Sequence, residues 1–179
     1  MIRAIKPYKF RRSSILNKVE KEIIAEFKRR VFDESYSRIF KCLDSLNEDQ
    51  VWHKANENSN SIGNLILHLQ GNVRQWMLST FANYPDNRKR SEEFKLESRI
   101  TTENLKKGLI DLQNDLMIVL DRISEKDLLK SYDVQVYTES GIAIFIHVIE
   151  HFSYHTGQIA MLTKLLDDKD LEFYPYSLE

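Results

Sequence analysis

The sequence predicts an all-α protein, most economically a four-helix bundle. Its three prolines, Pro7, Pro85 and Pro175, leave long stretches free of the residue that most strongly breaks a helix. In four of these stretches, apolar residues recur with the 3.6-residue period of an amphipathic helix. The chain has 179 residues, 42% hydrophobic and 30% charged, which is typical of one globular domain. A bundle lets four such helices bury their apolar stripes in one core.

The four long helices differ in how clearly the sequence marks their starts. Asn60 or Ser59 is the expected N-cap of the second helix, and Thr101 that of the third. Short extra turns are expected after Asn47 and Ser124, each of which begins a capping-box pattern. The long helices are expected at about Asn17–Ser45, Ser61–Phe81, Thr102–Ile123 and Gly141–Leu166.

The connections complete the predicted architecture. Residues Asn83–Arg90 are turn-rich and charged and lead into another polar stretch, so they predict a long crossover between the second and third helices. Tyr132–Tyr137 alternates apolar and polar residues and is the one plausible strand, a short extended segment before the fourth helix. We therefore expect a basic N-terminal tail or extension (1–16), a bundle domain (17–174) and a C-terminal tail (175–179).

Charge and cysteine content narrow the classes of partner. The net charge is −1, yet residues 1–30 carry ten Lys and Arg against three Glu. A solvated helix face and a loose tail account for this excess. An acidic partner is the alternative, but without a recognisable nucleic-acid module we expect no nucleic-acid binding. We expect no membrane association either, since no apolar run approaches about 20 residues. No secretory signal begins the chain and Cys42 is its only cysteine, which favours a cytoplasmic protein with an inert buried thiol.

Three of the five histidines stand four residues apart in the fourth helix, at His147, His151 and His155. Stepping about 100° per residue puts His155 near the middle of the apolar stripe, His151 just beside it, and His147 further toward the edge. A buried imidazole without a partner costs about 1–3 kcal/mol. A bound metal would supply that partner, and ordinary hydrogen bonds within the core are the alternative.

His68 lies beside the apolar stripe of the second helix and adds a nitrogen ligand from a different element. With two histidines of the fourth helix it would form half of a coordination sphere for a divalent ion and leave the other positions to water. Three imidazoles accept Zn²⁺, Ni²⁺ or Fe²⁺. The arrangement is not that of zinc proteases, because the helical pair lacks the glutamate of His-Glu-x-x-His.

Over about Phe32–Tyr174 the chain resembles the DinB-like superfamily of metal-binding four-helix bundles, and specifically a branch of unknown function. In that superfamily the metal ligands are one histidine of the second helix and a His-x-x-x-His pair of the fourth. The matching residues here are His68, His151 and His155. The segments that carry the resemblance are Ser59–Asn72, Asp86–Phe94 and His151–Ile159.

The resemblance makes His147 a neighbour of the metal, in a position to orient a ligand or a bound water. An ordinary hydrogen-bonding role at the edge of the core is the alternative for this residue. Further walls of the pocket are expected from proximity along the helices, although packing of the helix seam explains them equally well. These residues are Asn72, Trp76, Tyr154 and Gln158.

Characterised members of the superfamily are divalent-metal enzymes that activate a low-molecular-weight thiol, including S-transferases and a maleylpyruvate isomerase. The resemblance therefore implies a metal-dependent thiol S-transferase with a divalent metal, a thiol cosubstrate and a small-molecule substrate. No catalytic carboxylate or cationic clamp is assigned from the sequence. The alternative is a metal-binding or stress-response module without turnover, because a shared fold does not establish function.

A homodimer is expected from the fourth helix, where Phe145, Ile146 and Ile149 extend the apolar surface beyond the stripe that its own bundle needs. Local packing of Tyr132–Tyr137 over these side chains is the alternative.

Overall fold

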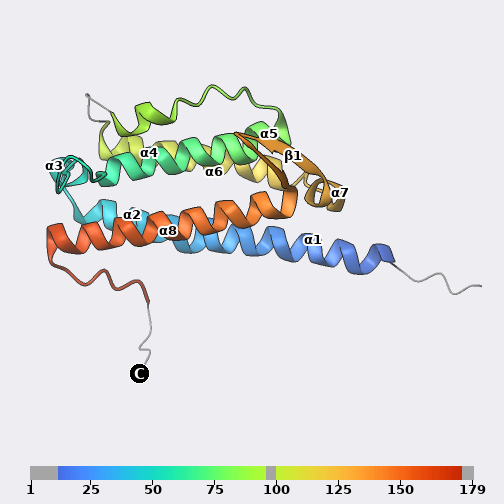
Figure 1. The fold of residues 1–179 in the computed structure, drawn as a ribbon. Coiled ribbons are helices and arrows are strands. Elements are labelled where there is room, and N and C mark those ends of the chain that lie inside the picture. The colour runs from blue at the N-terminus through green and yellow to red at the C-terminus, as the bar shows by residue number, and fades with distance from the viewer. Residues whose placement is uncertain (1–11, 96–99, 175–179) are drawn as a thin grey trace, which may run out of the picture.

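Four long helical rods build the part of the chain that the structure describes, and the all-α prediction is confirmed. The structure is a computed structural model that describes residues 12–95 and 100–174. Figure 1 shows two of the rods, α4 and α6, side by side above the other two, α2 and α8. The final rod, α8, contacts both the first rod and α4. This shared contact brings His68 and the histidines of α8 into one interface.

The first rod runs without a break through α1 (Arg12–Lys28), a π-helical stretch η1 (Arg29–Tyr36) and α2 (Ser37–Ser45). It begins five residues before the predicted start at Asn17. The Ser35 hydroxyl donates to the carbonyl of Arg30, five residues earlier, at 2.8 Å, which stabilises the wider turn. Of the predicted N-terminal tail, residues 1–11 lie outside the described residues, as does the predicted C-terminal tail.

The second rod contains α4 (Ile62–Val73), a π-helical stretch η2 (Arg74–Ser79) and α5 (Thr80–Ala82). Its N-cap is Ser61, so the prediction of Asn60 or Ser59 was wrong by one or two residues. The Ser61 hydroxyl accepts from the Asn64 amide at 3.1 Å, and the Asn64 side chain accepts from the Ser61 amide at 3.2 Å. This reciprocal pair is a capping box. The sequence did not reveal this cap, because the box has Asn64 at its last position in place of the usual Glu or Gln.

The third and fourth rods are α6 (Thr102–Leu120) and α8 (Gly141–Asp167). Thr101 caps α6, as predicted, by accepting from the Asn104 amide at 3.3 Å. Ser140 caps α8 by accepting from the Ala143 amide at 3.2 Å. Among the described residues, no helix has the length and apolar character needed to cross a lipid bilayer.

Short elements connect the rods. Both predicted capping boxes begin short helices, α3 (Glu48–Val51) after Asn47 and α7 (Glu125–Leu129) after Ser124. The crossover from the second rod to the third contains a 3₁₀ helix, η3 (Arg90–Phe94), that packs against α4. The predicted long crossover is thus present, with part of it ordered as a helix.

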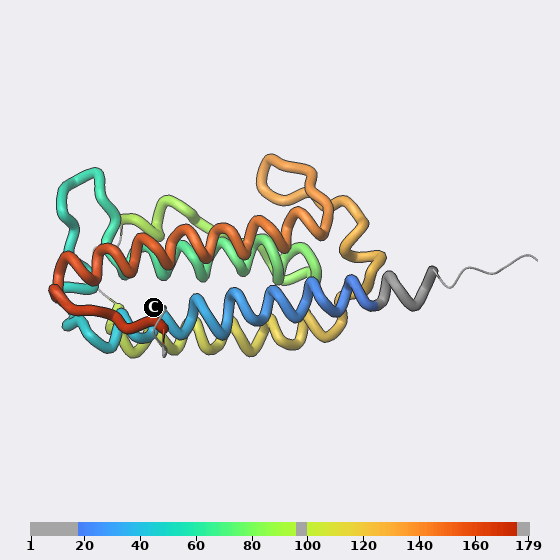
Figure 2. The backbone as a smooth tube through the Cα atoms, turned by 90° about the horizontal axis from the view of Figure 1, so that it is seen from below, coloured from blue at the N-terminus to red at the C-terminus, as the bar shows by residue number. Residues whose placement is uncertain are grey.

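The single predicted strand is instead an antiparallel hairpin of β1 (Ser131–Val134) and β2 (Tyr137–Ser140). Its turn contains Gln135 in the left-handed region, at φ 56°. Figure 2 shows the hairpin projecting from the bundle near the start of α8. The second strand was missed because Tyr137–Ser140 has little of the apolar alternation that marks a half-buried strand.

One continuous apolar core joins the rods, and it corrects part of the predicted dimer surface. The Phe145 side chain is 1% exposed, with its ring 5.1 Å from that of Phe27 and 5.8 Å from that of Phe81. Phe145 is therefore a core residue, because the first rod covers the side of α8 that the sequence left unpartnered. Ile146 is 58% exposed. Cys42 is buried, as predicted, and burial raises the pKa of its thiol.

Candidate metal centre

Three histidines from two helices converge where α4 packs against α8. His68 comes from α4, and His151 and His155 come from successive turns of α8. One ring nitrogen of each lies within 4.8 Å of the others, and the ring centroids are 4.5–5.0 Å apart. The sequence prediction placed these three together, and the packing of α4 on α8 accounts for their approach.

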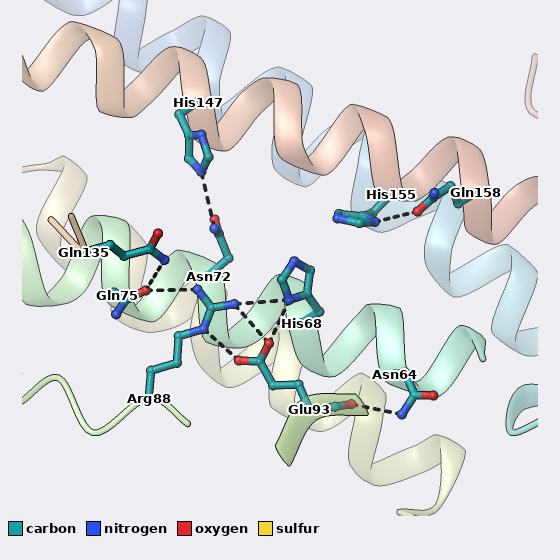
Figure 3. A network of polar contacts seen from close by, with 10 residues as sticks. All are labelled: Asn64, His68, Asn72, Gln75, Arg88, Glu93, Gln135, His147, His155 and Gln158. Atoms are coloured by element: carbon teal, nitrogen blue, oxygen red, sulfur yellow. Dashed lines mark hydrogen bonds and ion pairs between the residues drawn. The ribbon is translucent and has the colours of Figure 1, made fainter. Parts of the chain in front are cut away.

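The Glu93 carboxylate determines which nitrogen of His68 is available. Glu93 Oε2 lies 2.7 Å from His68 Nδ1, and Figure 3 shows the contact. An ionised carboxylate accepts hydrogen bonds only, so Nδ1 carries a proton, and in the neutral tautomer Nε2 is the nitrogen with the free lone pair. Arg88 Nη2, which lies 3.2 Å from Nδ1, is itself a donor and donates a hydrogen bond to Glu93 Oε2 at 3.0 Å.

Gln158 has the same effect on His155. Its Oε1 lies 2.7 Å from His155 Nδ1 and accepts a hydrogen bond from the Nδ1–H group. Nε2 of His155 is then the unprotonated nitrogen. Metal-binding histidines commonly donate their other ring N–H to a carboxylate or carbonyl oxygen in this way, which fixes both the tautomer and the ring orientation.

His151 supplies the strongest sign of a missing partner. Its Nε2 is buried and has no hydrogen-bond partner among the described residues. Burial, reinforced by the neighbouring histidines, lowers the pKa of His151 to about 3. The ring is therefore neutral and has a lone pair available. A divalent cation fits this donor set, because imidazole nitrogens from two helices converge within ligand reach of one another.

Glu93 and Arg88 were missed by the sequence reasoning, which assigned no carboxylate or cationic group to the site. Arg88 Nε donates to Glu93 Oε1 at 2.7 Å, and the two side chains are only 6% and 11% exposed. Burial alone raises the pKa of Glu93, but hydrogen bonds from His68 and Arg88 outweigh it and hold the pKa below its usual range. In the sequence, neither residue differs visibly from the charged neighbours Lys89 and Glu92.

A pocket of about 300 Å³ lies beside His68 and His151. It contains three of the predicted wall residues, Asn72, Trp76 and His147. The crossover and the β hairpin supply the rest of its lining. These further residues are Arg88, Arg90, Gln135, Tyr137 and Glu139.

His147 is held within this pocket by Asn72 and Trp76. Its Nε2 lies 3.3 Å from Asn72 Nδ2, and its ring stacks on Trp76 with centroids 3.7 Å apart. Burial lowers the pKa of His147, so it is a neutral acceptor for the Asn72 amide. The remaining predicted wall residues, Gln158 and Tyr154, do not line this pocket. Gln158 bonds to His155. Tyr154 is 61% exposed, and its ring lies 4.9 Å from that of His155.

Comparisons with known proteins identify the fold and leave the chemistry open. The profile of a family described as "Protein of unknown function (DUF1572)" matches residues 19–175. A DinB-like protein from Bacillus cereus is similar in structure, with a TM-score of 0.59 and 15% identity over 75% of this chain and 87% of that one. A DinB-like protein from Bacillus subtilis has a TM-score of 0.55 and 16% identity over 83% of this chain and 94% of that one. No functionally curated protein matches the sequence.

Proposed function

The chain belongs to the DUF1572 family of proteins of unknown function and has the DinB-like fold, and from this premise we propose that it binds a divalent metal ion through His68, His151 and His155. We further propose that the bound metal serves a transfer reaction of a low-molecular-weight thiol onto a small-molecule substrate.

The observation that carries the metal proposal is the state of the three imidazoles. Glu93 and Gln158 hold the protons of His68 and His155 on Nδ1, while Nε2 of His151 is buried without a partner among the described residues. Leaving such a group unpaired costs about 1–3 kcal/mol. An ion bound by all three nitrogens would remove that cost. Zn²⁺, Ni²⁺ and Fe²⁺ all suit imidazole ligands.

In the proposed site, side chains of the protein orient the imidazoles and balance the charge around them. When bound, a divalent ion with an open coordination position supplies Lewis-acid chemistry that lowers the pKa of a thiol or water. Glu93 and Gln158 orient the imidazoles of His68 and His155. Arg88 balances the charge of Glu93 inside the protein, so this ion pair adds no net charge beside the histidines.

The reaction class rests on the DinB-like resemblance together with the pocket beside His68 and His151. A structural metal site is closed by its ligands, whereas a catalytic site keeps access to a further position. A pocket of about 300 Å³ next to two of the three proposed ligands supports access for a small molecule. Asn72, Trp76 and His147 would then contact the substrate or the thiol cosubstrate. A metal-binding or stress-response module without turnover is the alternative function.

Elemental analysis of natively purified protein tests the metal proposal. We expect about one divalent ion per chain in the wild type, and loss of that ion in His155→Ala. His53→Ala is the matched control, because His53 is the one histidine outside the α4–α8 interface and is exposed. Absence of stoichiometric metal in the wild type after chelator-free purification would refute the proposal.

Thiol consumption tests the reaction class. Metal-loaded protein would be incubated with a panel of small thiols and a generic electrophile, with His155→Ala alongside. Faster consumption by the wild type is expected. Equal rates with full metal occupancy in the wild type would favour the non-catalytic alternative.

We also propose a homodimer through the exposed seam between α1 and α8. A groove there is lined by apolar side chains with charged residues among them: Val19, Ile23, Ile142, Phe145, Ile146 and Ile149, with Lys18, Glu22 and Glu26. Val19 and Ile146 are 48% and 58% exposed. Sedimentation at micromolar concentration is expected to give a dimer, and a monomer for Ile146→Lys. A wild-type monomer under these conditions would contradict the proposed homodimer.

A further inference from the structure

We infer that the crossover between α5 and α6 is a working part of the metal centre, and that Glu93 is a positioning residue that acts through His68. This inference rests on the proposed metal function. It adds to that function a requirement on residues outside the helices that carry the histidines.

The crossover is fixed to α4 at several points around His68. The Glu93 carboxylate bonds His68 Nδ1 at 2.7 Å, and the Glu93 carbonyl accepts from Asn64 Nδ2 at 2.9 Å. The Phe94 ring lies against the His68 ring, with centroids 5.0 Å apart. Both the side chain and the backbone of Glu93 are therefore anchored on the helix that presents the proposed ligand (Figure 3).

Arg88 also holds the Glu93 carboxylate in place. It binds both carboxylate oxygens, at 2.7 Å and 3.0 Å. A paired guanidinium and carboxylate of this kind is geometrically more specific than a single contact. Arg88 Nη1 also donates to Gln75 Oε1 at 3.0 Å, and the same oxygen accepts from Gln135 Nε2 at 2.6 Å. The crossover, α4 and the β hairpin are thus joined beside the pocket.

Gly71 makes room for this arrangement. A Cβ at residue 71 would overlap Glu93 Oε1 and would lie 3.1 Å from Arg88 Nε. Gly in a helix interior costs roughly 1 kcal/mol relative to Ala. A glycine at this position is explained by the approach of the carboxylate. An added methyl group would have to push away the flexible end of the Glu93 side chain, leaving the backbone of α4 intact.

The physical role of Glu93 follows from its contact with Nδ1. A carboxylate partner fixes the tautomer in which Nε2 is free, holds the ring plane, and makes the imidazole a stronger donor to a metal. Loss of such a partner typically weakens metal binding by roughly 10–100-fold. We therefore expect metal affinity to depend on two residues that contact no proposed metal position directly, Glu93 and Gly71.

Zinc affinity measured by competition with a chromophoric chelator tests this inference on the full chain. We expect Glu93→Gln and Gly71→Ala each to weaken Zn²⁺ binding at least about tenfold. Glu92→Gln is the matched control for charge, since Glu92 is 67% exposed in its side chain and pairs with Lys89. Gly157→Ala is the control for the methyl group, because a Cβ there meets no described atom within 4 Å.

A second measurement separates positioning from general loss of structure. Nitrogen-15 NMR of the metal-free protein reports the His68 tautomer, which we expect to be Nδ1–H in the wild type and a mixture of tautomers in Gly71→Ala. If Glu93→Gln fails to fold, the zinc affinity and tautomer of Gly71→Ala alone test the role of Glu93. Wild-type affinity in both variants would overturn the role of Glu93 and leave the metal proposal intact. A wild-type protein that binds no Zn²⁺ would overturn both.

Discussion

Asn72 of α4 and His147 of α8 face each other across the helix seam, with Asn72 Nδ2 3.3 Å from His147 Nε2. Each lies four residues from a proposed ligand, Asn72 after His68 and His147 before His151. The pair therefore forms a second layer one helical turn, about 5.4 Å, along the bundle from His68 and His151. His147 Nε2 already accepts a hydrogen bond, which sets it apart from Nε2 of His151, for which the described part of the chain offers no partner.

The different surroundings of these two histidines predict different effects of their removal. His151→Ala should reduce zinc affinity by more than about 100-fold, because a lost ligand costs more than a lost partner of a ligand. His147→Ala should change it by less than about tenfold and alter the pocket instead. Chelator competition on both variants checks this. A larger loss in His147→Ala would mean that the ligand pair on α8 is assigned to the wrong turn.

The stability of the metal-free protein should depend on pH through His151. Its pKa is about 3 in the folded state, below the value of about 6.5 in an unfolded chain. The unfolded chain therefore takes up the proton first, and the free energy of unfolding falls as pH drops from about 6.5 toward 3. Urea unfolding with a chelator at pH 7, 6 and 5 should show a steeper decline for the wild type than for His151→Gln. Parallel pH profiles would contradict the buried, neutral state of His151.

The capping box of α4 predicts a local loss of stability. Ser61→Ala should lower the free energy of unfolding by about 1–2 kcal/mol, since it removes the acceptor for the Asn64 amide. The neighbouring Asn60 is exposed, and Asn60→Ala should change stability by less than about 0.5 kcal/mol. Chemical denaturation of both variants measures the difference. An equal effect of the two substitutions would argue against Ser61 as the cap.

Two adjacent residues of α8 should differ sharply in their contribution to the core. Phe145→Ala should cost about 3–5 kcal/mol, because it opens a cavity between the rings of Phe27 and Phe81. Ile146→Ala should cost roughly 0.5 kcal/mol for a surface site. Denaturant unfolding at a concentration where both proteins are monomeric provides the comparison. A small cost for Phe145→Ala would place the first rod differently against α8.

The local features of the fold were readable from the sequence. The capping positions at Asn47, Thr101 and Ser124 and the existence of four long helices follow from interactions within one or two helical turns. Ser61 was missed because Asn64 is an uncommon partner in a capping box. The second hairpin strand was missed because no residue of Tyr137–Ser140 is buried, so its sequence has no strong apolar alternation.

The sequence by itself determined that four amphipathic helices form and that His68, His151 and His155 lie near their apolar stripes, because helical periodicity fixes which residues share a face. Only the tertiary structure decided that Glu93 and Arg88 belong to the same site and that Gly71 makes room for them. It also decided that Phe145 is buried. The path of a crossover and the cover over a helix face depend on contacts between distant segments, and residue spacing within one segment does not contain that information.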